Sequence, residues 1–373
     1  MITLSPTNLE ILNSLSVLII SVLMAGVLIP QILLISFRKN LFDVPDERKI
    51  HKSLVPRLGG IAFKPVIFFS IVLLLGFDTL IGGHSILSNF AAESRPLAFS
   101  FCCIMVLYLV GMADDLIGVR YLAKFIIQIA CGLMVIAGGL WMSGLHGLFG
   151  VGDMPVLAGY PLTILVVVFI INALNLIDGI DGLASGLSAV VMLFYGIIFQ
   201  MMGQPVYAML SFATLGVLLP FFYYNVWGNA ERGRKIFMGD TGSLTVGMMI
   251  CVLSLKMIRC DVEGSFGVNN FVVAYSPLIV PCFDVVRVYM HRVRNGRNPF
   301  LPDKNHIHHK MLALGMPQRV AMVTIVMVSA VFTLMNFVLS AFMAVTWILL
   351  IDVIVWTIAN IAISRAIRKR SKK

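Results

Sequence analysis

Residues 156–182 read VLAGYPLTILVVVFIINALNLIDGIDG, and this stretch decides the class of fold. No charged side chain occurs before Asp178, so the apolar part reaches the roughly 20 residues that a membrane-spanning helix requires. The stretch then ends in two Asp-Gly pairs, and glycine commonly interrupts a helix. It therefore predicts a membrane helix with polar groups gathered at one end.

The rest of the chain has the same apolar character. Of its 373 residues, 59% are hydrophobic and 12% are charged, and the mean hydropathy is +0.95. A soluble domain carries about 25% charged residues. The composition excludes a soluble, disordered or collagen-like protein and predicts an all-α, polytopic membrane helix bundle. Residues 1–13 hold no Lys or Arg, so we expect no cleavable signal peptide. Six scattered cysteines without a CxxC pair indicate neither disulfides nor a thiolate metal site.

The apolar runs predict eleven membrane-spanning helices in one integral-membrane domain, residues 1–373, with a basic tail at 365–373. The approximate bounds are 15–36, 62–81, 96–113, 121–141, 156–176, 183–202, 205–225, 240–257, 271–290, 319–343 and 345–364. Alternating loops place 25 of the 28 basic residues on one side and only Arg95, Lys256 and Arg259 on the other. Because basic loops face the cytoplasm, we expect the N-terminus outside and the C-terminus in the cytoplasm. Asp352 is expected at the outer membrane interface.

Two adjacent carboxylates, Asp114 and Asp115, follow the apolar run 96–113. A solvated helix end would explain an isolated Asp-Asp pair. Arg120 and Lys124 follow within three turns, however, and acids from other loops lie on the same predicted side. The pair is therefore a candidate for holding a cation, acting as a base or contacting substrate.

Asn172, Asn175, Asp178 and Asp181 follow one another at three-residue spacing. Side chains at i and i+3 are neighbours on a helix, and the glycines after each Asp predict a break near Asp178 that lets all four groups converge. An Asp-Gly turn alone would explain one Asp. It would not explain two Asn residues inside hydrocarbon, where polar groups are costly and usually functional.

Asp240 lies in the glycine-flanked segment FMGDTGS, 237–243, at the start of the eighth span. It could be a plain helix cap, or the helix N-terminus could offer free N–H groups to a phosphate. Asp284, inside the ninth span, is expected to pair with Arg287 at i+3.

The loop 291–318 brings together Arg292, Arg297 and three histidines, His306, His308 and His309. Such a cluster could suggest zinc, but neither a thiolate nor an HExxH motif accompanies it. The hard oxygen ligands suit Mg²⁺, or Mn²⁺, better. The histidines would then contact an anionic substrate or a base, whereas a basic loop that only binds lipid headgroups would explain the arginines alone.

Acids, amides and cations at one membrane face fit metal-dependent phosphoryl transfer to or from a lipid, in which charge neutralisation and positioning dominate. A transporter or flippase is the rival of a different class, but transporter sites tend to lie near the bilayer midplane. A CDP-alcohol phosphotransferase and a membrane scaffold are weaker alternatives.

The motifs in chain order resemble those of the polyprenyl-phosphate N-acetylhexosamine-1-phosphate transferase family, glycosyltransferase family 4. They are RKIHKSLVPRLGG (48–60), ADD (113–115), NALNLIDGIDGLASG (172–186), FMGDTGS (237–243) and PDKNHIHHKML (302–312). The HIHH form and the eleven spans are most similar to the undecaprenyl-phosphate N-acetylglucosaminyl-1-phosphate transferase branch. The resemblance implies Mg²⁺-dependent transfer of N-acetylglucosamine 1-phosphate from UDP-N-acetylglucosamine to undecaprenyl phosphate. UMP would be released and a lipid-linked cell-envelope glycan started, at the cytoplasmic face of a bacterial inner membrane.

The resemblance also implies roles for particular residues. Asn175 and Asp240 would bind Mg²⁺, and Lys124 would contact the donor diphosphate. Four acids would surround the acceptor phosphate and uridine: Asp114, Asp115, Asp178 and Asp181. Substrate binding would further involve Asn172 and the sugar- and phosphate-holding group His306, His308, His309, Arg292 and Arg297. Gly118 stands where the family carries a third acid. The expected partners are a UDP-sugar, a polyprenyl phosphate and the membrane, with a homodimer compatible and no nucleic acid.

Overall fold

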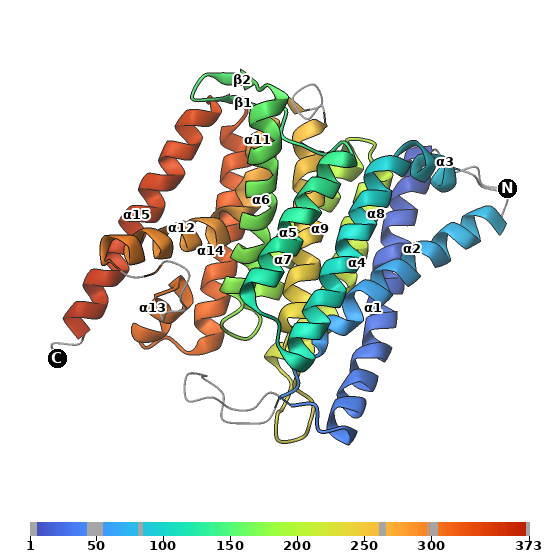
Figure 1. Cartoon of the computed structure of the whole chain (residues 1–373), viewed down its shortest axis with the longest axis horizontal. Coiled ribbons are helices and arrows are strands. Elements are labelled where there is room, and N and C mark those ends of the chain that lie inside the picture. Colours follow the sequence, from blue (N-terminus) through green and yellow to red (C-terminus); the bar gives the residue numbers. More distant parts are fainter. Residues whose placement is uncertain are drawn as a thin grey trace.

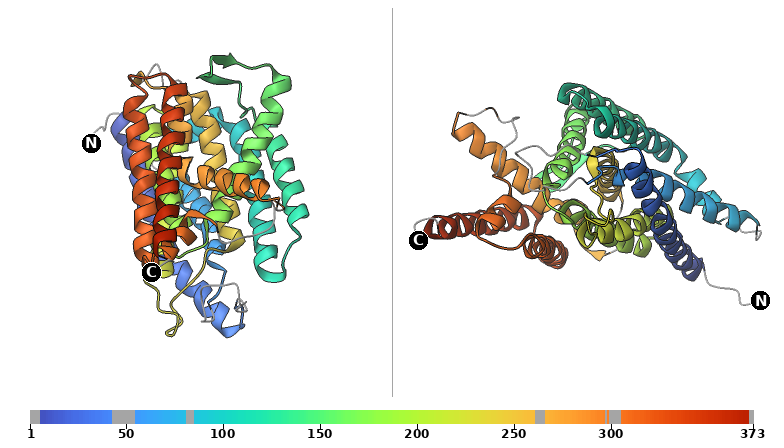
Figure 2. Two further views of the ribbon diagram at one scale, coloured as in Figure 1. Left: turned by 90° about the vertical axis from the view of Figure 1, so that its left-hand side faces the viewer. Right: turned by 90° about the horizontal axis from the view of Figure 1, so that it is seen from below.

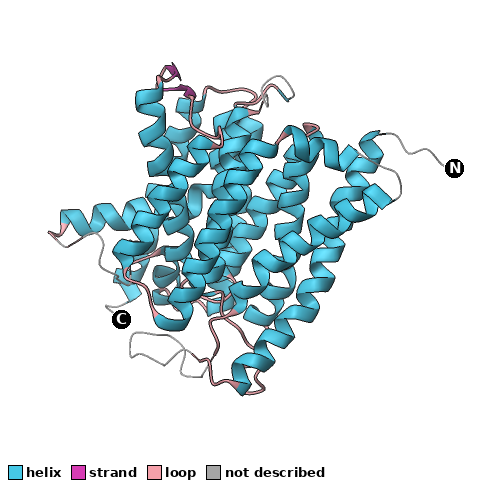
Figure 3. Cartoon of the chain, turned by 45° about the vertical axis from the view of Figure 1, so that its right-hand side comes forward, coloured by secondary structure: helices cyan, strands magenta, loops and turns pink. Residues whose placement is uncertain are grey.

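The computed structural model describes residues 6–42, 55–80, 85–260, 266–296, 298 and 305–370. These residues form helices and one small antiparallel hairpin, which confirms the all-α class (Figures 1 and 3). The α-helices are α1 Pro6–Arg38, α2 Phe63–Leu80, α3 Ser85–Ala92, α4 Ser94–Ile117, α5 Tyr121–Ala137, α6 Val156–Ile177, α7 Leu183–Met201, α8 Pro205–Val226, α9 Gly239–Arg259, α11 Asn270–Tyr275, α12 Ile279–Arg294, α13 Ile307–Ala313, α14 Gln318–Leu339 and α15 Val345–Arg370. Two 3₁₀ turns, η1 Gly59–Ala62 and η2 Ser276–Leu278, and the strands β1 Gly144–Leu148 and β2 Val151–Asp153 complete the structure.

The predicted spans coincide with helical segments of the described chain. Ten of these segments are long and apolar enough to cross a membrane, and the 17-residue α5 is a shorter apolar helix at the remaining predicted position. Helix α1 begins at the upper end of the bundle in Figure 1, and α15 ends at the lower end. This arrangement is what an odd number of crossings requires. The first residues of the predicted basic tail, Arg365–Arg370, continue α15 as helix.

Helix α9 lies at the centre of the bundle. In its most apolar window 94% of the residues are buried, against 28% in α1 and 22% in α15, which lie at the periphery. Glycines let neighbouring backbones approach α9 closely: a Cβ on Gly111 of α4 would lie 2.5 Å from the Cα of Thr241. The start of α9 is therefore enclosed by α4 and by the segment around Gly60, whose N–H donates to the carbonyl of Met238 at 3.0 Å.

The ninth predicted span, 271–290, lies within the helical segment Asn270–Arg294, but this segment is not a single straight helix. Helix α11 ends at Tyr275, η2 contains Pro277, and α12 then runs across the other helices (Figures 1 and 2). Proline has no N–H to donate and its ring clashes with the preceding turn, so it ends or bends a helix. Seen from below, α12 and α15 extend together away from the centre of the bundle (Figure 2).

Asp352 of α15 is buried, not interfacial as the sequence suggested. Its Oδ2 accepts hydrogen bonds from the Tyr275 hydroxyl at 3.0 Å and from the Asn336 amide at 2.8 Å. Position along the span indicated an interfacial site, but a buried carboxylate is tolerated where neighbouring helices supply donors. The three residues join α15 to α11 and α14.

Candidate active site

The lower end of the bundle in Figure 1 is where α4 and α6 end and α5 and α9 begin, and α13 lies beside them. The candidate acids and amides of these helix ends lie there. At their centre, Lys124 of α5 bridges two carboxylates. Its Nζ lies 3.2 Å from Asp114 Oδ1 of α4 and 2.7 Å from Asp240 Oδ2 of α9. All three side chains are about one-fifth exposed, so the cluster is open to a ligand on one side.

Asn175, in the last turn of α6, joins this cluster as expected. Its Nδ2 donates to Asp240 Oδ1 at 3.2 Å and to Ser243 Oγ at 2.9 Å, which leaves its carbonyl oxygen as the atom available to a cation. The residue pair assigned to a metal from the sequence is thus in direct contact.

Asp115 has a different environment from Asp114. Its Oδ1 accepts the backbone N–H of Asp240 at 2.8 Å, and its Oδ2 accepts the backbone N–H of Thr241 at 2.9 Å and the Thr241 hydroxyl at 2.6 Å. The carboxylate therefore caps α9 from another helix, and a negative charge at a helix N-terminus is stabilising. The expectation that this N-terminus offers free N–H groups to a phosphate is wrong for Asp240 and Thr241, because Asp115 already occupies both.

Gly118, at the position of the family's third acid, shapes the turn after α4. Its φ of +73° lies in the region that glycine adopts readily, and the following N–H, of Val119, donates to Asp114 Oδ1 at 2.8 Å. A backbone N–H thus supports Asp114 where the sequence pattern suggested another carboxylate.

Helix α6 ends at Ile177, and α7 begins after Gly182, whose φ is +79°. The predicted break near Asp178 is confirmed. Two of the four polar groups also have partners outside the Lys124 cluster. Asp181 forms an ion pair with Lys235 at 2.5 Å. Asn172 donates to Gln128 Oε1 of α5 at 2.6 Å and to a carbonyl of its own helix.

Asp178 itself caps the end of α6 and lies close enough to the cluster for the charge of Asp240 to act on it. Desolvation by the surrounding protein, and then the charges of Asp240 and Asp181, raise the pKa of Asp178 to about 7, although Arg57 opposes the shift. A cation bound beside it would favour its ionised form. Arg57, in the loop before η1, received no role from the sequence; its only signal there was the Pro-Arg-Leu-Gly-Gly pattern.

The histidine segment is organised by Asp284 of α12. His306 Nδ1 lies 2.8 Å from Asp284 Oδ2, and the N–H of Ile307 donates to Asp284 Oδ1 at 3.0 Å. Arg287 forms the expected i+3 ion pair with Asp284 at 2.7 Å and also donates to the carbonyl of Asn305. Asp284 therefore fixes the start of α13.

His308 connects this segment to the end of α6. Its ring lies against Gly179, where a Cβ would overlap the imidazole, so only glycine permits the contact. The rings of His308 and His309 have centroids 4.1 Å apart. Burial, and then the neighbouring His309 and His306, lower the pKa of His308 to about 3. Neither of its ring nitrogens has a hydrogen-bond partner among the described residues, so a neutral, buried imidazole is available to a ligand.

Of the two predicted substrate-binding arginines, only one lies in the described part of the chain. Arg292 is buried in α12, two turns beyond Asp284 on the same helix face. Arg297 lies outside the described residues, as does the first part of the 48–60 motif.

The donor set fits magnesium better than zinc. Within the described part of the chain, no three His, Cys, Asp or Glu side chains are grouped closely enough to hold a metal on their own. A structural zinc site would require four such ligands. Magnesium is commonly bound by one or two carboxylates together with substrate phosphates and water. Asp240, Asp114 and the Asn175 carbonyl oxygen match that set.

Comparison with known proteins identifies the family of the chain. Residues 97–258 match the model of glycosyl transferase family 4, a range that includes Asp114, Lys124, Asn175 and Asp240. The chain is 32% identical, over 88% of its length and 85% of the relative's, to a Bacillus subtilis (strain 168) protein named probable undecaprenyl-phosphate N-acetylglucosaminyl 1-phosphate transferase.

Two further relatives are named undecaprenyl-phosphate alpha-N-acetylglucosaminyl 1-phosphate transferase. The protein of Escherichia coli (strain K12) is 33% identical over 78% of this chain and 74% of its own. That of Salmonella typhi is 32% identical over 87% of this chain and 83% of its own. The similarity covers most of each chain. The chain therefore belongs to glycosyl transferase family 4.

Proposed function

We propose that this protein transfers N-acetylglucosamine 1-phosphate from UDP-N-acetylglucosamine to undecaprenyl phosphate and releases UMP. The observation that carries the proposal is the bridge that Lys124 forms between Asp114 and Asp240, beside Asn175, at one end of a membrane helix bundle. The names of the relatives support this choice of donor and acceptor. The acceptor's polyprenyl chain would remain in the bilayer while its phosphate reaches the cluster.

In this reaction an oxygen of the acceptor phosphate attacks the sugar-bearing phosphorus of the donor. The bond from that phosphorus to the bridging oxygen breaks, and the electron pair leaves with UMP. A phosphate monoester has its second pKa near 6, so most of the acceptor is already dianionic at neutral pH. Asp114 would therefore position charged groups, and removing a proton from the acceptor would add little.

Magnesium would be held by Asp240, Asp114 and the Asn175 carbonyl oxygen, and when bound it would neutralise charge on the donor diphosphate. Lys124 supplies a second positive charge to the same phosphates. His308, neutral and buried against Gly179, can donate or accept a hydrogen bond to the sugar. Arg292 is the nearby described cation of α12 that we assign to a substrate phosphate.

The basic loops support a cytoplasmic active site. Helix α1, which ends at Arg38, and α15 both end at the same end of the bundle as the candidate site (Figure 1). Lys235 pairs with Asp181, and the charge of Arg57 acts on Asp178. We therefore place that end at the cytoplasmic face of a bacterial inner membrane. A transport function is disfavoured because the polar cluster lies at the ends of α4 and α6 and not at mid-helix, where transporter sites are usually found.

The test uses the purified full-length protein with undecaprenyl phosphate, UDP-N-acetylglucosamine and Mg²⁺, and measures UMP together with the lipid-linked sugar. We expect equal amounts of both products, a loss of both with EDTA, and recovery when Mg²⁺ or Mn²⁺ is restored. Asp240→Asn should lose at least about 100-fold in rate, because it removes a charged ligand from the phosphates. Absence of UMP with every UDP-N-acetylhexosamine tried would refute the proposal.

A further inference from the structure

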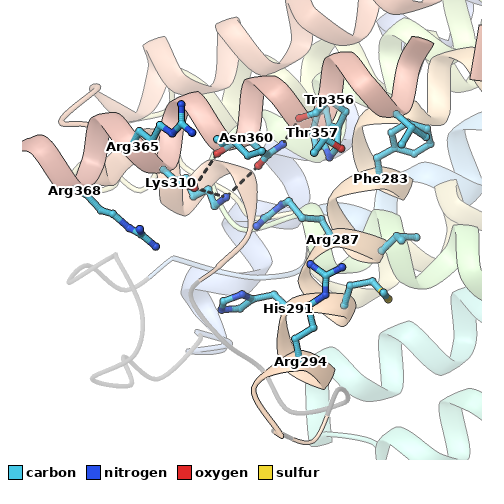
Figure 4. Close-up of a pocket in the computed structure, with 15 residues that line it drawn as sticks. Phe283, Arg287, His291, Arg294, Lys310, Trp356, Thr357, Asn360, Arg365 and Arg368 are labelled. Atoms are coloured by element: carbon cyan, nitrogen blue, oxygen red, sulfur yellow. Dashed lines mark hydrogen bonds between the residues drawn. The ribbon is translucent and has the colours of Figure 1, made fainter. Parts of the chain in front are cut away.

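A second polar site lies between α12, α13 and α15, away from the acid cluster. It is a pocket of about 610 Å³, within the ~300–1,000 Å³ range of ordinary ligand sites (Figure 4). Five basic side chains line it: Arg287, Arg294, Lys310, Arg365 and Arg368. None of its fifteen described lining residues is Asp or Glu, so the pocket is suited to an anion.

Lys310 is the clearest sign of a missing anionic partner. Its half-buried Nζ donates to Asn360 Oδ1 at 3.2 Å and to Ser364 Oγ at 3.1 Å, both neutral (Figure 4). No carboxylate lies within ion-pair distance of it among the described residues. Burial, and then the charge of Arg287, lower the pKa of Lys310 to about 8. A bound anion would reverse this effect, because an opposite charge favours the protonated lysine.

Two further donors in the pocket lining are unpaired. Trp356 is 8% exposed, and its indole N–H has no hydrogen-bond partner within the described chain. The Nε of Arg287 is likewise buried without a described partner. Buried donors in proteins are nearly always satisfied, so two unpaired N–H groups lining one cavity call for an acceptor there. The two unpaired N–H groups call for an acceptor whatever the number of basic residues that line the pocket.

Apolar side chains line another part of the pocket and extend to the surface of the protein. Phe283 and Trp356 form part of its wall. Val286, Met290 and Val353 also line it and are each 45–48% exposed on peripheral helices. A ligand that fills the whole pocket therefore combines a negatively charged, oxygen-rich head with apolar chains.

We propose that this pocket binds an anionic phospholipid of the surrounding membrane. Its phosphate would lie among Lys310, Arg287 and Trp356, and its acyl chains along Phe283 and Val353. Phosphate oxygens match lysine, arginine and indole donors, and basic pockets between membrane helices suit anionic headgroups. The acceptor lipid is the less suitable occupant, because none of the residues of the acid cluster lines this pocket.

Arg287 connects the pocket to the histidine segment. Arg287 lines the pocket and also contacts Asp284 and the carbonyl of Asn305, and Asp284 in turn holds His306. A phosphate on Arg287 would hold its guanidinium in place and so stabilise the start of α13. Occupancy would then support the histidine segment without contacting the substrates.

The experiment reconstitutes the full-length protein in phosphatidylcholine vesicles and titrates in dibromo-phosphatidylglycerol, whose bromines quench nearby tryptophans. We expect saturable quenching of Trp356, which disappears in Trp356→Phe, and at least tenfold weaker quenching with dibromo-phosphatidylcholine. Lys310→Gln should raise the half-saturating lipid fraction about tenfold, because it removes a charge-assisted hydrogen bond. Lys310→Arg should stay within about threefold of wild type.

The matched control is Lys369→Gln, which removes the same charge from the last turn of α15, the helix opposite Lys310, but does not line the pocket. It should change half-saturation less than twofold. Equal effects of the two Gln substitutions, or equal quenching by both brominated lipids, would overturn the proposal. Stoichiometric displacement by undecaprenyl phosphate would also overturn it and assign the pocket to the acceptor. Because the readout is lipid binding, it is independent of transferase activity.

Discussion

Asp114 and Asp115 are adjacent, and replacing each by Asn should separate catalysis from architecture. The Asp115 carboxylate accepts three hydrogen bonds from the start of α9. Asparagine has one acceptor oxygen, which can keep both bonds from Thr241, but its NH₂ group would then face the N–H of Asp240, so one bond is lost and two donors are opposed. Hydrogen bonds to a charged group contribute about 1.5–3 kcal/mol each, and we expect Asp115→Asn to cost about 2–4 kcal/mol.

Asp114→Asn should behave differently. Its remaining oxygen can keep the hydrogen bond from Val119, and the loss falls on the ion pair with Lys124. We expect a thermal midpoint close to wild type together with a rate reduced at least about 100-fold, because a group that positions the phosphates is lost.

The assay compares thermal unfolding in detergent with UMP release for both variants, and repeats the rate measurement at pH 7 and pH 9. Asp115→Asn should lower the unfolding midpoint by several degrees, whereas Asp114→Asn should not. An Asp115→Asn protein with wild-type stability and no turnover would show that Asp115 acts on substrate. Recovery of Asp114→Asn activity at high pH would show that Asp114 serves as a base.

Three more predictions concern stability, each measured by thermal unfolding. Folding raises the pKa of Asp178 from its ordinary value of 3.8 to about 7, so between these pH values the folded state keeps a proton that the unfolded chain has lost. The free energy of unfolding should therefore fall as pH rises from about 4 to about 7 and stay level above that. Asp178→Asn should lose this pH dependence. Gly111→Ala should lower the free energy of unfolding by about 1–3 kcal/mol, because its Cβ meets the Thr241 backbone. The Cβ of Gly76→Ala meets nothing within 4 Å, so this variant should stabilise α2 slightly. Equal effects of the two variants would contradict the close approach of α4 to α9. Asp352→Asn retains an oxygen for both incoming hydrogen bonds and should leave stability unchanged. Asp352→Leu leaves two buried donors unpaired and should lower the free energy of unfolding by about 2–4 kcal/mol. A destabilised Asn variant would show that the negative charge itself is required.

Hydropathy and charge were sufficient to predict the spans, because membrane helices are set by the local length of apolar sequence. The bend at Pro277 was not predicted, although the proline itself was the local signal for it. The burial of Asp352 could not be predicted, because it depends on which residues the neighbouring helices present at that depth.

Some of the contacts within the candidate site were expected from the sequence and others were not. Asn175 and Asp240 meet as expected, since each lies at a helix end whose position the glycines indicate. Asn172 instead faces Gln128, because three residues advance an α-helix by only about 300° and the side chain drifts round the axis. The cap that Asp115 forms requires α4 to approach α9 at Gly111, and sequence spacing within one helix contains no information about that contact.

The cap on α9 also affects which molecules the site can accept. A helix N-terminus ordinarily attracts anions, but here Asp115 has already neutralised it. Asp114 and Asp240 add further negative charge, which Lys124 and Arg57 offset only in part. A free phosphate or a bare nucleotide therefore meets repulsion, whereas the same anion arriving with a divalent cation does not. The site thus discriminates by the charge of the whole complex, which disfavours occupation by the many metal-free anions around it.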